Sequence, residues 1–336
     1  MNFRYLKYLA LTATSWALAS SDDILVGGQA VIEGVMMRSP KGYSVAVRRP
    51  DGSVGVIKDV LLTAGEKWRI FKLPIFRGIG VLGQAMVLGI KALRYSAEEA
   101  LAAEDAKVKA EAAPEAPGAA TASIGEIKSS PSKPAPVSSW LIAGNLILAL
   151  SINIVIFFVL PLFITRYIQT SLGFENPLIF SAIDGVFRVG MFVSFLLLIS
   201  RMNDMNRVFQ YHGAEHKTVF NFEARESLEI DNARKYSTFH PRCGTSFLMV
   251  VMVVSIIVFS IVHFDSITGK LLSRLALLPL ILGISYEVLR YSARHPGSLM
   301  RWITLPGLLL QRITTKEPDD KQLETAIKAL EEALTV

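Results

Sequence analysis

Long uninterrupted apolar runs in the second half of the chain are its clearest pattern. A helix that crosses the hydrocarbon core of a bilayer needs roughly 20 predominantly apolar residues. Four runs approach or exceed that length, at residues 140–164, 178–200, 247–264 and 271–289. We therefore expect an α-helical polytopic membrane protein with about four transmembrane helices, in a membrane domain that covers residues 140–313.

In the N-terminal part of the chain, apolar positions alternate with polar ones instead of forming long runs. Residues 43–49 and 53–59 alternate apolar and polar positions, as half-buried strands do, and Pro-Asp-Gly at 50–52 between them is a turn signal. This pattern predicts a small N-terminal β-rich domain over residues 21–75.

Four further segments flank these two domains. Residues 1–20 resemble a signal peptide, but we interpret them as an uncleaved interfacial segment. In residues 76–104 the uncharged stretch is too short to span comfortably, which favours an amphipathic helix at the membrane surface. Residues 105–139 are rich in Ala, Pro, Ser and Lys and predict a flexible linker. Residues 314–336 predict a C-terminal amphipathic helix whose apolar stripe must pack on another part of the chain, with the β-rich domain as the candidate.

Basic residues are distributed unequally among the loops. The loop at residues 201–246 carries seven of them, whereas the loop at 165–177 carries only Arg166. Cytoplasmic loops are enriched in Lys and Arg. We therefore expect the large loop, the β-rich domain and both termini on the cytoplasmic side of a bacterial inner membrane. A cleaved signal peptide would break this arrangement.

Composition agrees with a membrane protein. The chain is 51% hydrophobic and 19% charged, with a mean hydropathy of +0.40. We attribute its net charge of +6 to the positive-inside bias and to attraction by anionic lipid, not to nucleic-acid binding. The expected partners are the lipid bilayer and a membrane protein. The single cysteine, Cys243, excludes an intramolecular disulfide.

The pattern His-x-x-Glu-His is the sharpest chemical feature of the sequence. In a helix, His212 and His216 lie four residues apart on one face, so both imidazoles can bind one metal ion. Glu215 lies beside that face. In the inverted zincin pattern, a glutamate at this place serves as the general base.

A second cluster of metal-binding residue types follows. His240 and Cys243 are two good zinc ligands separated by two residues, and Glu287 is a candidate oxygen ligand. The expected topology brings all of them near the cytoplasmic interface. Two histidines of the first cluster plus His240 and Cys243 would give a closed structural site, whereas three ligands plus water would give a catalytic site with Glu215 placed to activate that water. A third reading is that no metal binds and the histidines dock the loop on the membrane domain.

One charged pair interrupts the second apolar run. Asp184 and Arg188 are four residues apart, so they can pair on one helix face. Charged groups inside a membrane are costly unless they are paired. They form either an interhelical ion pair near the outer interface or part of a polar cavity used in transport.

Four motifs together resemble a known family. The segments at 27–38, 211–218, 240–247 and 290–297 resemble the YqhQ-like family of bacterial membrane proteins, and the match covers nearly everything from 26 to 334. The resemblance implies a metal-dependent enzyme, because the family is catalogued as predicted metal-dependent enzymes. It implies no particular reaction or substrate.

These observations favour a zinc-dependent membrane enzyme, a hydrolase, with its site at the cytoplasmic face. His212, His216 and either His240 or Cys243 would hold zinc, and Glu215 would be the base. The alternative is a non-enzymatic membrane scaffold or membrane-protein assembly factor with a structural metal or none.

Overall fold

The structure is a computed structural model of the whole chain. It describes residues 26–111, 139–262, 264, 266–295 and 300–336. The apolar segment expected at residues 1–20, and all but the ends of the linker expected at 105–139, lie outside the described residues. The described part is mostly helical, with a small antiparallel sheet near its N-terminal end.

The sheet has four antiparallel strands in sequence order: β1 (Gly27–Val31), β2 (Gly34–Arg38), β3 (Gly42–Arg48) and β4 (Val54–Val60). The predicted hairpin is β3 and β4, and Val45 pairs with Ile57 in its register. The turn between them contains Gly52 at a φ of 87°, a left-handed conformation that glycine adopts without steric cost. The glycine-rich stretch before this hairpin forms the first two strands.

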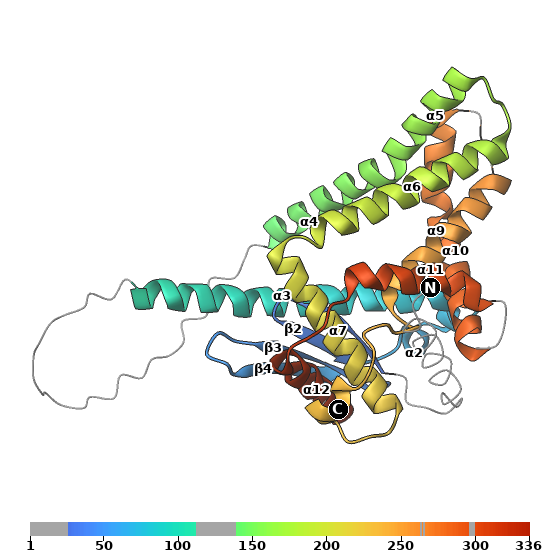
Figure 1. Cartoon of the computed structure of the whole chain (residues 1–336). Helices are drawn as coiled ribbons and strands as arrows, with labels where there is room; N and C mark the ends of the chain where they lie inside the picture. Colours follow the sequence, from blue (N-terminus) through green and yellow to red (C-terminus); the bar gives the residue numbers. More distant parts are fainter. Residues whose placement is uncertain (1–25, 112–138, 263, 265, 296–299) are drawn as a thin grey trace, which may run out of the picture.

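Two short helical turns, α2 (Ala64–Lys67) and η1 (Arg69–Lys72), lead into the long helix α3 (Phe76–Glu111). The middle of α3 packs Leu88 and Ala92 on the face of the sheet that holds Val45 and Val47. The start of α3 contacts α10, where an added Cβ at Gly78 would approach the Tyr286 side chain to 2.6 Å. Figure 1 shows α3 lying crosswise to α9 and α10.

The first predicted apolar run forms one continuous helical rod. It consists of α4 (Ser139–Ile154), the π-helical segment η2 (Val155–Val159) and α5 (Leu160–Leu172). Pro161 lacks an amide hydrogen, and its ring clashes with the carbonyl four residues earlier in a regular α-helix. The wider π-helical turn directly before it accommodates that ring.

The other predicted runs become α6 (Pro177–Ile199), α9 (Gly244–Ile261) and α10 (Ile267–Arg294). Five helices of the described chain are long and apolar enough to cross a membrane: the rod of α4 and α5, then α6, α9, α10 and α3. The sequence predicted about four, and α3 is the additional helix. Its best window has a mean hydropathy of 1.3, the lowest of the five, and α3 also packs on the sheet.

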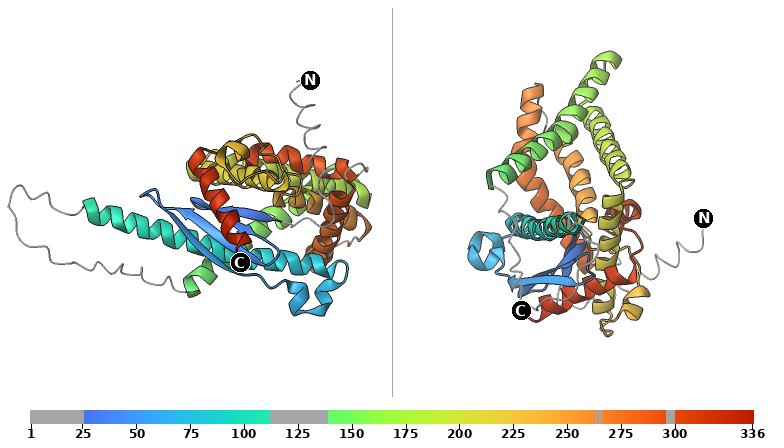
Figure 2. Two further views of the ribbon diagram at one scale, coloured as in Figure 1. Left: turned by 90° about the horizontal axis from the view of Figure 1, so that it is seen from below. Right: turned by 90° about the vertical axis from the view of Figure 1, so that its left-hand side faces the viewer.

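The large loop and the C-terminal part complete a layer below the membrane helices. The loop contains α7 (Asn203–Glu223) and α8 (Ile230–Arg234), and α10 is followed by α11 (Met300–Thr314) and α12 (Asp320–Leu334). The sheet lies between α3 on one face and α7 with α12 on the other, as Figure 2 shows for α3 and α12. Side chains alternate between faces along a strand, so Val35 and Met37 contact the α7 side while Met36 faces α3.

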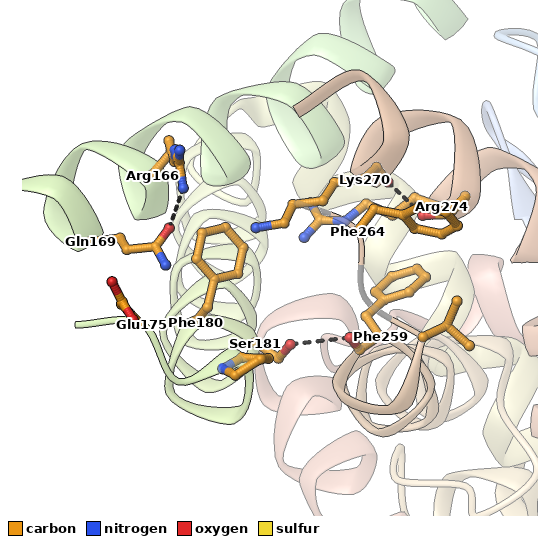
Figure 3. A pocket seen from close by; sticks show the side chains of 12 residues that line it. Arg166, Gln169, Glu175, Phe180, Ser181, Phe259, Phe264, Lys270 and Arg274 are labelled. Carbon is orange, nitrogen blue, oxygen red and sulfur yellow. Dashed lines mark hydrogen bonds between the residues drawn. The ribbon is translucent and has the colours of Figure 1, made fainter. Parts of the chain in front are cut away.

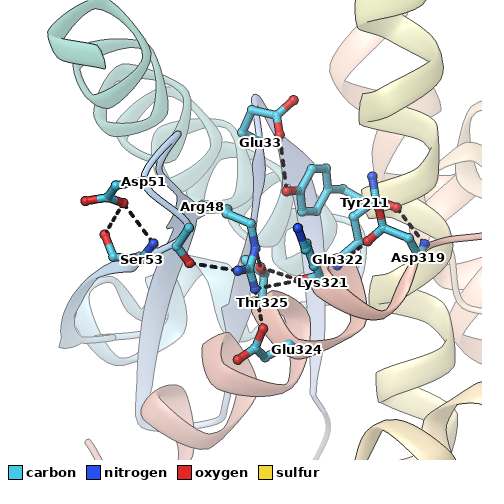
Figure 4. Close-up of polar contacts among 11 residues, drawn as sticks. Glu33, Arg48, Asp51, Ser53, Tyr211, Asp319, Lys321, Gln322, Glu324 and Thr325 are labelled. Atoms are coloured by element: carbon cyan, nitrogen blue, oxygen red, sulfur yellow. Dashed lines mark hydrogen bonds and ion pairs between the residues drawn. The ribbon is translucent and has the colours of Figure 1, made fainter. Parts of the chain in front are cut away.

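The C-terminal amphipathic helix packs on the β-rich domain. Its predicted apolar stripe buries Leu323, Ala326, Ile327 and Leu330. Ser39 Oγ donates a hydrogen bond of 2.8 Å to Ala333 O, and Ser44 Oγ donates one to Ala329 O. Figure 4 shows a third contact between the sheet and α12. Arg48 of β3 donates hydrogen bonds to the side chains of Thr325 and Glu324, in the first turns of α12.

Candidate metal centre

Helix α7 places the His-x-x-Glu-His pattern between the membrane helices and the sheet. His212 and His216 lie on one face of this helix, as their spacing predicts, with ring centroids 4.4 Å apart. Glu215 and His216 are 7% and 2% exposed, because α7 packs against β1 and α12. Glu215 and His216 are therefore buried and His212 is half-buried, in contrast to an ordinary solvent-exposed helical surface.

Backbone carbonyl groups orient both imidazoles. His212 Nδ1 lies 2.8 Å from Thr314 O, and His216 Nδ1 lies 2.5 Å from Thr238 O. A carbonyl oxygen can only accept, so each Nδ1 donates its hydrogen, and Nε2 is the nitrogen that each ring, when neutral, offers to a metal. Metal-binding histidines typically donate their other ring N–H to a carbonyl or carboxylate oxygen in this way.

The two Nε2 atoms converge on a single sulfur. Cys243 is the N-cap residue of α9, and its Sγ lies 3.2 Å from His212 Nε2. His216 Nε2 is buried and has no hydrogen-bond partner. The ligand atoms of His212, His216 and Cys243 all lie within 4.8 Å of one another. This buried group could therefore bind one metal ion.

The electrostatics of the group favour the form of cysteine that binds metals. Burial alone would raise the pKa of the Cys243 thiol, but His212 and His216 outweigh it and lower that pKa well below its ordinary value. Burial likewise opposes the charge on His212, and the neighbouring cysteine overcomes it and raises the pKa of His212 to about 9. The thiolate, not the thiol, is the metal ligand. Two imidazoles and a thiolate are a donor set that suits zinc.

Glu215 lies between this group and the sheet. An added Cβ at Gly28 of β1 would lie 3.1 Å from Glu215 Cδ, so the carboxyl group rests against that strand. Its Oε2 is buried without a hydrogen-bond partner, and burial raises the pKa of Glu215. Arg38 of β2 interacts electrostatically with the same carboxyl group. Sequence reasoning missed Gly28 and Arg38, although both belong to the glycine-rich motif of the N-terminal domain.

His240 lies beside the group but faces another partner. Its ring centroid is 5.6 Å from that of His216, and Arg242 N donates a 3.2 Å hydrogen bond to His240 Nδ1. Burial lowers the pKa of His240 to about 4, so the ring is neutral at pH 7. With Nδ1 accepting, its hydrogen is on Nε2, which lies 3.4 Å from Glu223 Oε1. In this orientation His240 has no free lone pair for a metal.

Glu287 pairs with Arg77 rather than with the candidate metal centre. Its Oε1 accepts a 2.6 Å hydrogen bond from Arg77 Nε and a 3.3 Å hydrogen bond from Ile75 N. Among the described residues, the group of converging donor atoms contains His212, His216 and Cys243 but neither Glu287 nor His240. The structure thus assigns Glu287 to the contact between α3 and α10.

The fold and this group define a multi-span membrane protein with a candidate His2Cys metal centre. The chain belongs to the family described as "Protein of unknown function (DUF1385)", whose model matches residues 73–336. A curated relative is "Uncharacterized protein YqhQ" of Bacillus subtilis (strain 168), 32% identical over 314 residues, which are 92% of each chain. No solved structure matches. The comparisons confirm the resemblance at the level of the family.

Proposed function

We propose that this chain is a zinc-dependent membrane enzyme, a hydrolase, in which His212, His216 and Cys243 hold the metal and Glu215 accepts a proton. The observation that carries the proposal is the convergence of three donor atoms within 4.8 Å beside a buried carboxyl group with an unpartnered oxygen. Catalytic zinc sites commonly have three protein ligands and keep the fourth position open, whereas structural sites are closed.

The chain's own residues would divide the chemistry between them. A zinc ion held here would supply Lewis acidity and lower the pKa of water at its open position. The carbonyl groups of Thr314 and Thr238 keep the two imidazoles in the tautomer that binds metal. Glu215 Oε2 is the atom that would accept the proton, and the pKa raised by burial suits an acid–base group.

The proposed location is the cytoplasmic face of a bacterial inner membrane, with both termini inside. The sheet, α7 and α12 pack on one another, so all three lie on one side of the membrane. An even number of crossings must therefore separate the sheet from α7, and α7 from α12. The α4–α5 rod with α6, and then α9 with α10, satisfy this requirement, whereas a crossing α3 would not. The basic residues of the loop at 201–246 favour the cytoplasmic side.

A second candidate function is a membrane scaffold or membrane-protein assembly factor with a structural zinc site. The observation that favours it is the position of His240, whose ring centroid is 5.6 Å from that of His216. A rotation of that ring would supply a fourth ligand and close the site. The hydrogen bond from Arg242 N to His240 Nδ1 opposes this rotation.

The test is the zinc content of the full-length chain, purified in detergent without chelators. We expect one zinc ion per chain in the wild type and at least a tenfold loss of affinity in His216→Ala, since removing a ligand should cost no less than the roughly 10–100-fold typical of changing a residue that hydrogen-bonds a ligand. His295→Ala is the matched control, because this exposed histidine bonds to Tyr291 O. Wild-type protein without zinc or another transition metal would contradict both metal hypotheses.

Two further variants separate the enzyme from the scaffold. Glu215→Gln preserves shape but cannot accept a proton, so the enzyme hypothesis expects full zinc content and failure to complement a null strain. His240→Ala should leave zinc affinity unchanged if three ligands hold the metal, and should weaken it if four do. Full complementation by Glu215→Gln together with zinc loss in His240→Ala would favour the structural site.

A further inference from the structure

A basic cavity lies at the end of the membrane domain remote from the metal centre. Its volume is about 140 Å³, and it opens between α5, α6 and α10 (Figure 3). Helix α9 begins next to Cys243 and reaches the cavity at Phe259. At 1.5 Å per residue, the 16 residues from Cys243 to Phe259 separate the two sites by about 24 Å.

The lining of this cavity is rich in positive charge. Arg166 of α5 and Lys270 and Arg274 of α10 line it, and Glu175 is the one acidic residue among the lining residues that the structure describes. Glu175 is exposed, whereas Arg274 is 3% exposed and forms part of the buried wall. Lys270 Nζ lies 3.6 Å from the centre of the Phe180 ring, so its ammonium group extends across the cavity toward α6.

The wall behind the cavity contains more positive than negative charge. Asp184 Oδ2 forms ion pairs with Arg188 Nη2 at 2.7 Å and with Arg274 Nη2 at 2.9 Å. All three side chains are at most 7% exposed. The predicted pair of Asp184 and Arg188 is thus present, with Arg274 as a third member. Within the described chain, two guanidinium groups share one carboxylate. Asp184 Oδ1 and Arg188 Nε also lack hydrogen-bond partners.

This excess charge sits inside membrane-spanning helices, where an uncompensated ion is costly. The faces of Phe158 and Phe259 lie 5.3–5.6 Å from the two guanidinium carbons and offset part of that cost. A counter-anion would offset the remainder. The basic cavity is the open space that Arg274 adjoins, and it is large enough for several waters or for a small anion.

We propose that the basic cavity binds a phosphate group, supplied by a phospholipid headgroup or by free phosphate. Guanidinium groups bind phosphate oxygens through charge-assisted hydrogen bonds, and lysine adds a point charge. The cavity lies where α6 begins at Pro177 and α10 begins at Ile267, at the level of a bilayer where headgroups are found. The proposal is independent of the metal centre.

The experiment measures ligand-induced stabilisation of the full-length chain in a maltoside detergent, which contains no phosphate. The probes are dioleoyl phosphatidylglycerol, dioleoylglycerol as the same lipid without its phosphate, and inorganic phosphate. Lys270→Gln removes a cation from the cavity without altering the contacts of Asp184. Arg201→Gln is the control, since Arg201 is exposed and follows the opposite end of α6.

We expect phosphatidylglycerol to raise the melting temperature of the wild type and of Arg201→Gln equally. Lys270→Gln should need about tenfold more lipid, the change expected when one charge-assisted contact is lost. Stabilisation by phosphatidylglycerol alone identifies a lipid headgroup, and stabilisation by inorganic phosphate as well identifies a site open to free phosphate. Equal stabilisation by dioleoylglycerol, or an unchanged lipid requirement in Lys270→Gln, would overturn the proposal and leave the Arg–Asp–Arg network as a purely structural feature.

Discussion

Two backbone carbonyl groups decide which nitrogen each histidine of α7 presents to the metal centre. Thr314 O closes the last turn of α11, and Thr238 O belongs to the segment before α9. Neither carbonyl is close in sequence to its histidine. The centre is therefore assembled only when α11 and this segment pack against α7. A thiolate at the N-cap of α9 is also favoured by the positive end of the helix dipole.

At the residue scale, Gly28→Ala should destabilise the protein and disturb Glu215. An added Cβ would collide with Met36 O and lie 3.1 Å from Glu215 Cδ. Overpacking of this kind typically costs ~1–3 kcal/mol, which corresponds to a melting temperature lower by about 2–10 °C. Gly27→Ala is the matched control, because nothing lies within 4 Å of its added Cβ. Equal melting temperatures for the two variants would contradict the close packing of Gly28 against β2 and Glu215.

At the scale of elements, local patterns predicted the helices better than the sheet. The four apolar runs became the α4–α5 rod, α6, α9 and α10, because a run of that length has few alternatives to a helix. The hairpin of β3 and β4 was visible in its alternation and its turn. Strands β1 and β2 were not, since glycines usually mark turns. Here Gly28 and Gly34 allow close approach instead, at Gly34 to the backbone of Ala46.

At the same scale, Leu330→Ala should loosen the contact of α12 with the sheet. Leu330 is fully buried in the core cluster that joins the sheet, α7 and α12. Removing such a side chain typically costs ~2–5 kcal/mol, because a cavity remains. Glu331→Ala is the control on the exposed side of the same turn. Amide hydrogen exchange in β2 and β3 should accelerate in Leu330→Ala only, and unchanged exchange there would argue against α12 as a structural support of the sheet.

At the scale of the whole molecule, the sequence predicted part of the candidate metal centre but not how distant helices pack around the sheet. The spacing of His212 and His216 predicted a shared face, and the structure brings Cys243 to it. The separate placement of Glu287 was not predictable, because its partner Arg77 comes from α3, more than 200 residues earlier in the chain. Loop charges lead to a prediction of which side of the membrane each loop occupies, and that prediction awaits its test. The sequence could not show that α3 and α7 enclose one sheet.

That enclosure leads to a prediction about α3, the fifth helix that is long and apolar enough to cross a membrane. Since α3 packs on the sheet, and the sheet packs on α7 and α12, we expect α3 to remain on their side of the membrane. An epitope tag inserted in the full-length chain between Asp51 and Gly52, in the exposed β3–β4 turn that precedes α3, should then share its side with a tag after Val336. Both tags should be cleaved by protease in inverted inner-membrane vesicles and protected in spheroplasts.

A tag between Leu172 and Pro177, in the turn that joins α5 to α6, is the control for the opposite side. It should be cleaved in spheroplasts and protected in inverted vesicles, since the α4–α5 rod crosses once. If the tag in the β3–β4 turn instead follows this control, α3 crosses the membrane. The sheet and α12 would then lie on opposite sides and could not share the hydrogen bond from Ser39 Oγ to Ala333 O. The vesicle experiment therefore tests the packing of the sheet and the count of crossings together.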